Sequence, residues 1–264
     1  MADTKVSALT AAGSAADANE FPINEAGTSK KVTLAQIEAQ IMASPTITSP
    51  TFAAGSASAS SWPKLTAGTV MTTAEVGAME QDTNCLYHTT DAGNRGYVPV
   101  RHFIRCDSAR TLPSDSNENA IFNSPANGRI TLETGTYIFE ALMQVTAMSA
   151  TSGNALLDWL GAGTATCAAW MWWYSALDNS TPTTGATHQS AIRVTQDSAA
   201  SIATAGAGTG LNVYARGTFE ITVAGTVIPS IDLVTGAAAS VGIGSYFMLE
   251  RIGSTTVASV GQWD

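Results

Sequence analysis

Charged residues are scarce in this sequence of 264 amino acids: they make up 12% of the chain, about half the usual fraction in soluble domains. Basic residues are the scarcer sign, with 12 against 21 acidic residues and a formal net charge of −9. Nucleic-acid binding and docking on anionic lipid both need clustered lysine and arginine, so we expect neither partner. The longest apolar stretch spans residues 168–177, whereas a membrane helix needs roughly 20 residues, so we expect no membrane insertion.

Cysteine is scarce too, with 3 residues in the chain. Cys85, Cys106 and Cys167 are widely spaced, form no Cys-x-x-Cys pair and lie beside no pair of histidines. Zinc sites and redox motifs need closely spaced ligands or thiols. We therefore expect small buried or half-buried thiols, folding in a reducing cytoplasm, and no metal ion or other cofactor.

Residues for catalysis show no recognisable pattern. The chain has 3 histidines and no Gly-x-Ser-x-Gly, the turn that exposes a hydrolase serine. The run Asp115–Asn119 is similar to the first half of a calcium loop, but Ala120 and Ala126 stand where Gly and Glu are needed, so we expect a polar turn. Spacing cannot pair the carboxylates that fall on predicted strands, which are Glu140, Asp158, Glu220, Asp232 and Glu250. We expect no catalytic residues and no enzymatic activity.

Small residues are abundant instead. Ala, Gly, Ser and Thr make up roughly half of the chain, which suits repetitive β structure and close packing between chains better than a charged free monomer. All lysines lie at or before residue 64 and all arginines at or after residue 95. This asymmetry indicates a mosaic of segments.

The first segment, residues 1–41, has few apolar residues and cannot bury much surface by itself, so we expect a partner to order it. A short amphipathic helix is predicted over Thr33–Ile41, with a capping box formed by Thr33 and Gln36. The residues expected to anchor the segment are its apolar side chains Val6, Leu9, Phe21, Ile23, Leu34 and Ile37.

The next two segments are predicted to be a stalk, residues 42–64, and a β collar, residues 65–101. Ser44–Thr48 and Ser49–Ala53 repeat the pattern Ser-Pro-Thr-apolar-small, and proline at this spacing excludes a helix or a central strand. The stalk is either a flexible linker or a thin bundle in which Ile47 and Phe52 meet their copies on an axis. Collar strands are predicted over Gly68–Thr72, Gly77–Glu80, Cys85–Thr90 and Arg95–Pro99.

The last segment, residues 102–264, is predicted to be a head with an antiparallel β-sandwich fold of the jelly-roll type. Its alternating runs, rich in β-branched and aromatic residues, predict eight strands without helices between them. They are Ile130–Glu133, Thr136–Met148, Ala155–Leu160, Cys167–Ala176, His188–Thr195, Asn212–Val223, Val227–Val234 and Ser245–Ile252.

Two of these strands have apolar residues on both faces, which indicates that a second chain covers one face. In residues 168–174, Trp170 and Trp172 share one face, and Met171 and Trp173 share the other. The aromatic cluster suits core or interface packing, with a sugar-stacking platform as the alternative. The residues predicted at the subunit interface are Ile47, Phe52, Trp170, Trp172 and Trp173.

Several stretches resemble known virion proteins. Ala2–Thr10, followed by Glu20–Asn24 and Gly27–Ile37, resembles the start of bacteriophage tail-fibre and virion appendage proteins, and Gly68–Pro99 resembles a module of phage structural proteins. Gly135–Glu140 and Gly244–Ile252 resemble the early and closing strands of trimeric heads of the tumour-necrosis-factor and complement C1q type.

This resemblance implies a bacteriophage virion structural protein, a homotrimeric tail fibre or similar appendage located in the virion. Residues 1–41 would bind other virion proteins, and the head would contact the host surface. Alternatives are a head fibre or capsid decoration protein and a glycan-binding module that recognises a host surface glycan. A depolymerase ranks last, because such enzymes usually carry a long β-helix.

Overall fold

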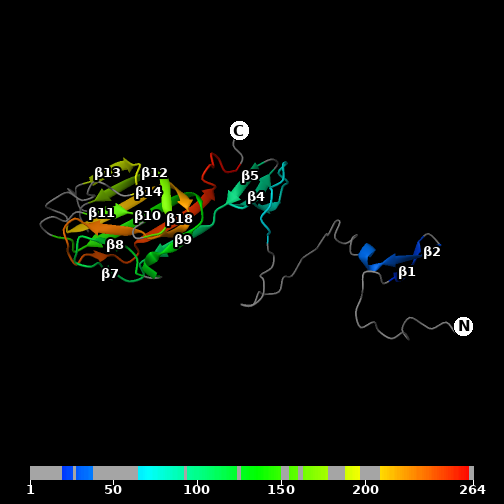
Figure 1. The fold of residues 1–264 in the computed structure, drawn as a ribbon, viewed down its shortest axis with the longest axis horizontal. Helices are drawn as coiled ribbons and strands as arrows, with labels where there is room; N and C mark the ends of the chain where they lie inside the picture. The colour runs from blue at the N-terminus through cyan, green and yellow to red at the C-terminus, as the bar shows by residue number, and fades with distance from the viewer. Residues whose placement is uncertain are drawn as a thin grey trace, which may run out of the picture. The chain divides into compact units, whose positions relative to one another are not determined.

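The computed structural model describes residues 20–25, 28–37, 65–91, 94–123, 126–149, 155–159, 163–177, 188–196 and 209–261. It divides the chain into two units, Met1–Lys64 and Leu65–Asp264 (Figure 1). Strands dominate the described residues of both units, so the prediction of a mainly β protein is confirmed. In the described part of the chain, no helix is long and apolar enough to cross a membrane.

The first unit contains a hairpin that the sequence did not predict. Strand β1 (Glu20–Glu25) pairs antiparallel with β2 (Thr28–Thr33). The helix predicted after it is present over residues 34–37, and the rest of its predicted length lies outside the described residues. Its capping box is confirmed, because the backbone N of Gln36 donates to Oγ1 of Thr33 and the backbone N of Thr33 donates to Oε1 of Gln36, at 3.2 and 2.9 Å.

The predicted anchor residues can be placed only in part. Phe21 and Ile23 belong to β1, and Leu34 and Ile37 belong to the helix. Val6 and Leu9 lie outside the described residues, as do Ile47 and Phe52 of the predicted stalk. The anchor and stalk assignments therefore stay predictions.

The collar is a three-stranded antiparallel sheet in the order β3-β4-β5. Its strands are β3 (Met79–Gln81), β4 (Leu86–Asp91) and β5 (Asn94–Val98). The turn between β3 and β4 is held by Asp82, whose carboxylate accepts hydrogen bonds from the backbone N of Asn84 and of Cys85, at 2.6 and 2.7 Å. An aspartate that bonds the backbone two and three residues ahead is a common way to hold such a turn.

The prediction of a strand over Gly68–Thr72 is wrong. Its backbone joins no ladder, because the N of Met71 donates to the side chain of Glu80 and the carbonyl of Met71 accepts from the guanidinium of Arg95, at 2.6 and 2.7 Å. Arg95 also pairs with Glu80 at 3.0 Å. The side chains of an ion pair thus bind the backbone N–H and carbonyl of Met71, to which a neighbouring strand would otherwise hydrogen-bond.

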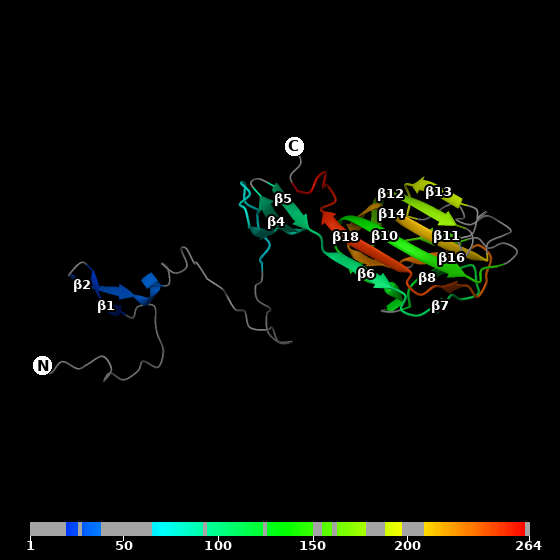
Figure 2. The same cartoon turned by 180° about the vertical axis from the view of Figure 1, so that it is seen from behind.

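The head is built from one large sheet facing smaller sheets, as predicted for a sandwich. Figure 2 shows the strands of the large sheet side by side, in the order β13-β12-β14-β10-β18-β6. These strands are β6 (Arg101–Arg105), β10 (Gly135–Thr146), β12 (Thr166–Leu177), β13 (His188–Arg193), β14 (Gly210–Val223) and β18 (Tyr246–Gly253). Two short strands, β7 (Arg110–Thr111) and β17 (Ser240–Val241), extend this sheet beside β10.

The opposite layer consists of short strands, visible in front in Figure 1. One group has the order β11-β16-β8, and β9 pairs with β15. The strands are β8 (Glu118–Ala120), β9 (Ile130–Leu132), β11 (Ala155–Asp158), β15 (Gly225–Val227) and β16 (Ser230–Leu233), with a 3₁₀ turn at Ala126–Gly128.

The core lies between the two layers and is centred on Phe139 of β10. Residues 137, 139, 141, 143 and 145 alternate inward and are 0–3% exposed, as the alternation predicted. The ring of Phe139 contacts the rings of Trp159, Trp172 and Phe247, with centroids 5.2, 6.4 and 5.7 Å apart. Aromatic packing of this kind ties strands from both layers to one point.

Gly217 of β14 lies opposite Trp172 of β12, where a side chain has no room. A Cβ at this position would overlap the Cβ of Trp172 and the carbonyl oxygen of Met171. The close approach lets β12 follow β14 beyond the irregularity between Ala168 and Met171. Glycine here is therefore a packing requirement.

Replacing Gly217 by alanine is expected to lower the free energy of unfolding by about 1–3 kcal/mol, because overpacking pushes two paired strands apart. The melting temperature should fall by about 2–4 °C for each kcal/mol in a domain of this size. Gly68→Ala is the matched control, since a Cβ there meets nothing within 4 Å. Equal melting temperatures for the two variants would contradict the close approach.

Candidate functional site

The structure corrects part of the predicted interface. Trp170 and Trp172 are 7% and 1% exposed within the single chain, and the indole N of Trp172 donates to the carbonyl of Thr195 at 2.6 Å. Side chains enclosed by their own chain have no surface left for a partner. Both belong to the sandwich core, so of the three tryptophans only Trp173 remains a predicted interface residue.

Trp173 belongs to an exposed apolar patch on the outer face of the large sheet, here named the β12–β13 patch. Its members are Met171, Trp173, Ile192 and Val194, which are 61%, 38%, 69% and 68% exposed. Ile192 lies directly opposite Trp173 in the register of β13 and β12. Four large apolar side chains at the edge of a sheet mark an interaction surface.

Ile192 and Val194 were not singled out by the sequence. Residues 188–193 alternate between exposed and half-buried positions, so the alternation in the sequence indicates that every second side chain shares one face. The alternation alone does not show which of the two sets of side chains faces outward, because the pairing of β13 with β12 decides the orientation.

A second apolar group, the β6–β18 patch, lies toward the other edge of the same face. Phe103 is 60% exposed and stacks on Tyr246, with ring centroids 5.5 Å apart. Leu142 of β10, which is 44% exposed, lies opposite Tyr246 in the register. Phe103, Leu142 and Tyr246 make up this patch.

Polar side chains separate the two patches. Arg216 of β14 lies opposite Glu140 of β10, and Arg216 is exposed. The hydroxyl of Tyr246 donates to Oε1 of Glu140 at 2.5 Å, and this hydrogen bond raises the pKa of Tyr246 to about 12. This hydrogen bond fixes the carboxylate of Glu140, and both Glu140 and Arg216 line the same cavity. These residues form the central polar row.

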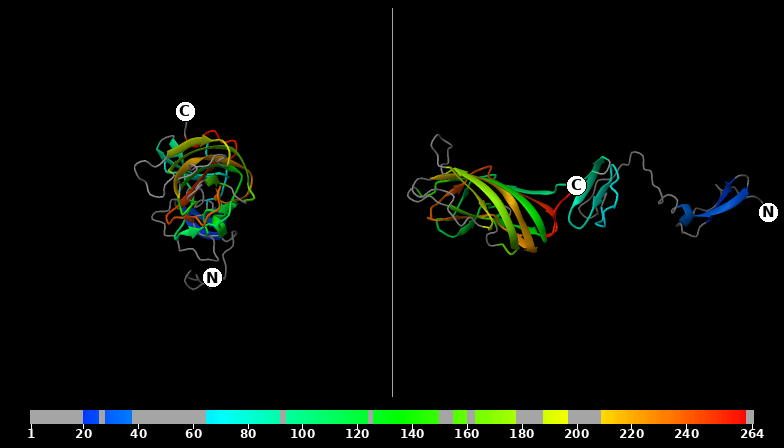
Figure 3. Two further views of the ribbon diagram at one scale, coloured as in Figure 1. Left: turned by 90° about the vertical axis from the view of Figure 1, so that its left-hand side faces the viewer. Right: turned by 90° about the horizontal axis from the view of Figure 1, so that it is seen from above.

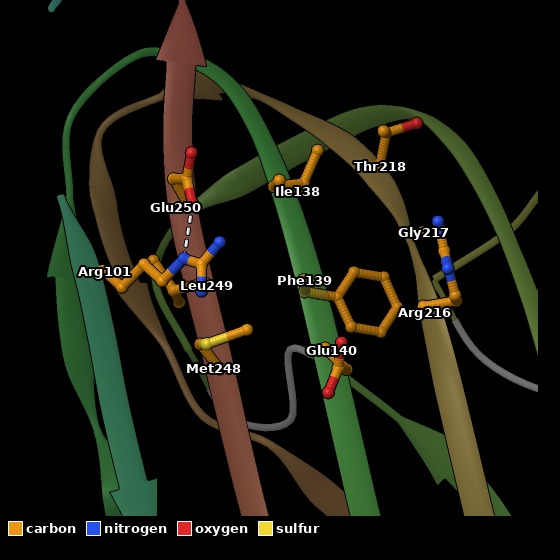
Figure 4. Close-up of a pocket in the computed structure, with 10 residues that line it drawn as sticks. All are labelled: Arg101, Ile138, Phe139, Glu140, Arg216, Gly217, Thr218, Met248, Leu249 and Glu250. Atoms are coloured by element: carbon orange, nitrogen blue, oxygen red, sulfur yellow. Dashed lines mark hydrogen bonds and ion pairs between the residues drawn. The ribbon is translucent and has the colours of Figure 1, made fainter. Parts of the chain in front are cut away.

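Next to this row, an ion pair between an exposed guanidinium and a buried carboxylate joins β6 and β18. Nε of Arg101 donates to Oε2 of Glu250 at 2.8 Å, and Glu250 is 1% exposed (Figure 4). A hydrogen bond from the hydroxyl of Tyr97 to Glu250 raises the pKa of Tyr97 to about 12. Arg101, Glu250, Glu140 and Arg216 are among the residues that line a cavity of about 250 Å³. Since Tyr97 belongs to β5, the same carboxylate connects the collar to the head.

Arg251, the next residue of β18, makes a second connection between head and collar. Its guanidinium donates to Oδ1 of Asn84 and the carbonyl of Thr83 in the collar turn, at 3.0 and 3.4 Å, and to the carbonyl of Thr134. Glu250 and Arg251 are successive residues of one strand, so β18 contacts the collar through side chains of both its faces.

Carboxylates of the smaller layer meet in a way that spacing did not predict. Glu118 of β8 lies opposite Asp232 of β16. Partial burial and the neighbouring carboxylate of Asp158 raise the pKa of Glu118, and burial raises that of Asp232. No cluster of three or more metal-binding side chains occurs among the residues that the structure describes.

The polar turn predicted at Asp115–Asn119 is present over Asp115–Asn117, whereas Glu118 and Asn119 already belong to β8. Oδ1 of Asp115 accepts hydrogen bonds from the backbone N of Asn117 and the side-chain amide of Asn119, at 3.2 and 2.9 Å. The carboxylate oxygen that a cation would use is therefore bonded within the loop.

The three cysteines are free thiols; Cys85 and Cys106 are buried and Cys167 is half-buried. Burial raises the pKa of all three, and that of Cys167 to about 12. A thiol with a raised pKa stays protonated at neutral pH and reacts slowly.

In the native chain at pH 8 we therefore expect slow reaction of all three cysteines with a thiol reagent such as DTNB. A pKa of about 12 leaves about one Cys167 thiolate in 10,000 at this pH. After unfolding in urea, all three thiols should react within minutes. A thiol of the native protein that reacts as fast as in the unfolded chain would contradict the burial.

No protein-family model matches this chain, and no curated protein matches it. A solved structure with some similarity is the crystal structure of the infectious bursal disease virus VP2 subviral particle, with 12% identity and a TM-score of 0.21. The match covers 75% of this chain and 53% of the other, so this chain spans about half the length of that protein. A likeness at this TM-score carries no argument, and the chemistry of the outer face is what bears on function.

Proposed function

We propose that this chain is a non-enzymatic bacteriophage virion protein that forms a homotrimeric tail fibre or similar appendage. Residues 1–41 attach it to other virion proteins, residues 42–64 form its stalk, and residues 102–264 form the head that contacts the host surface. The resemblance of Ala2–Thr10 and Gly27–Ile37 to phage appendage proteins supports the attachment.

The observation that carries the trimer is the outer face of the large sheet. Five large apolar side chains on one face of a six-strand array, together with Val194 directly after β13, are 38–69% exposed. They are Phe103, Leu142, Met171, Trp173, Ile192 and Val194. Groups of large exposed apolar side chains mark interaction surfaces, and copies of the same chain that cover this sheet face would remove them from water.

Labelling of virions tests the assignment. Antibody raised against residues 102–264 should decorate tail appendages in electron micrographs of purified particles. Decoration of the capsid would replace the tail fibre by a head fibre or capsid decoration protein. Absence of the chain from purified particles, checked by mass spectrometry, would overturn the virion assignment.

A second candidate function, recognition of host surface glycan, is favoured by one observation. Trp173 and Arg216 lie together with Met171 and Ile192 around an open cavity of about 430 Å³. An aromatic ring beside a guanidinium suits stacking and hydrogen bonding to a sugar. A glycan array incubated with the assembled head tests this candidate: binding lost in Trp173→Ala supports it, and no binding to any glycan contradicts it.

A further inference from the structure

The two apolar patches lie on opposite flanks of one sheet face. The β12–β13 patch occupies one edge of the six-strand order and Phe103 of the β6–β18 patch the other. With strands about 4.8 Å apart, five steps separate the edges by about 24 Å. Neither patch can therefore cover the other within one chain (Figure 2).

The shape of the face restricts how copies can cover it. Seen end-on, the strands of the large sheet follow an arc around the core, so the outer face is convex (Figure 3). Two convex faces that meet across a two-fold axis touch mainly at their centres, where this face carries its polar row. In a closed ring, each convex body touches its neighbours on its two flanks, where this face carries its apolar patches.

Charge supports the same arrangement. The centre of the face holds Arg216 on one strand and Glu140 on the next, directly opposite each other in the register. In a trimer whose three-fold axis passes over these strands, the guanidinium of each copy would lie near the carboxylate of a neighbouring copy. Alternating charges attract, whereas a face with one sign of charge at its centre would repel its copies.

We infer that the trimer contact is heterologous: the β12–β13 patch of each copy packs against the β6–β18 patch of the next, and the central polar row faces the three-fold axis. The occupant of each patch is a second copy of this chain. This inference rests on the proposed homotrimer, and it adds which strands meet and which line the axis.

Cysteine cross-linking of the full-length chain tests the pairing. We would prepare Ile192→Cys, Phe103→Cys and the double variant, and treat each with a short bismaleimide. The native thiols are buried or half-buried and have raised pKa values, so background is low. The control is the double variant Ile192→Cys with Val234→Cys. Val234 is 48% exposed and lies in the segment between β16 and β17, outside the large sheet.

The double variant should give covalently linked trimers on a denaturing gel, and neither single variant should link to itself. A mixture of the two single variants, unfolded and refolded together, should give linked dimers. A trimer in which Ile192→Cys links to itself, or in which the control pair links as well as the Ile192–Phe103 pair, would overturn the pairing while leaving the proposed function intact. A chain that stays monomeric by mass would overturn both.

Discussion

Replacing Trp172 by alanine is expected to abolish the stable fold of the head. The side chain is 1% exposed and contacts the rings of Trp159 and Tyr174, with centroids 5.5 and 5.7 Å away. Removing a buried tryptophan costs about 3–5 kcal/mol, and the carbonyl of Thr195 also loses its indole donor. Many domains have little more stability than this to lose.

Trp173→Ala is the matched control, since it removes the same ring from the next position of the same strand. Trp173 is 38% exposed on the outer face, so its loss should leave the melting temperature of the dissociated head nearly unchanged and weaken assembly instead. Thermal melts followed by circular dichroism, with oligomer mass measured in parallel, separate the two effects. Equal effects of both variants on folding would contradict the division of β12 into a core face and an interface face.

Replacing Ile192 and Met171 together by aspartate is expected to convert the trimer into folded monomers. Both side chains are more than 60% exposed in the single chain, so the change costs the monomer little. In the trimer, each contact loses two apolar side chains, worth roughly 1.5–3 kcal/mol each when fully buried, and gains two charges that must be desolvated. The effect occurs at every contact of the ring.

Light scattering at micromolar concentration measures this result, with circular dichroism as the check on folding. Val234→Asp is the control, because Val234 is 48% exposed outside the large sheet. The double variant should have the mass of one chain and an unchanged spectrum. A double variant that retains the mass of the unmodified protein would remove the β12–β13 patch from the interface.

Most strands of the head could be predicted from alternation alone. The inward set of β10, from Tyr137 to Val145, matches its buried residues position by position. The predicted strand Val227–Val234 is in fact two, β15 and β16, because Pro229 interrupts the run and cannot donate to a ladder. The local pattern is sufficient to predict a strand where both the strand and its pairing partners are long.

The exposed apolar residues of the outer face could be predicted only in part. The sequence shows that Trp172 and Trp173 point to opposite faces, but not which face meets the core. That choice depends on pairing with β14 and β13, strands more than ten residues away in the chain. The exposure of Phe103 could not be predicted from the sequence, because it follows from the position of β6 at the edge of the sheet.

The mass of the purified, unmodified chain in solution tests the central claim most directly. Light scattering coupled to size exclusion should give the mass of three chains, stable on dilution through the micromolar range. This result is expected because the outer face of the large sheet exposes two apolar patches, which neighbouring copies would cover in the proposed trimer. A folded monomer across that range would contradict the claim and turn attention to Trp173 and Arg216 as a ligand site.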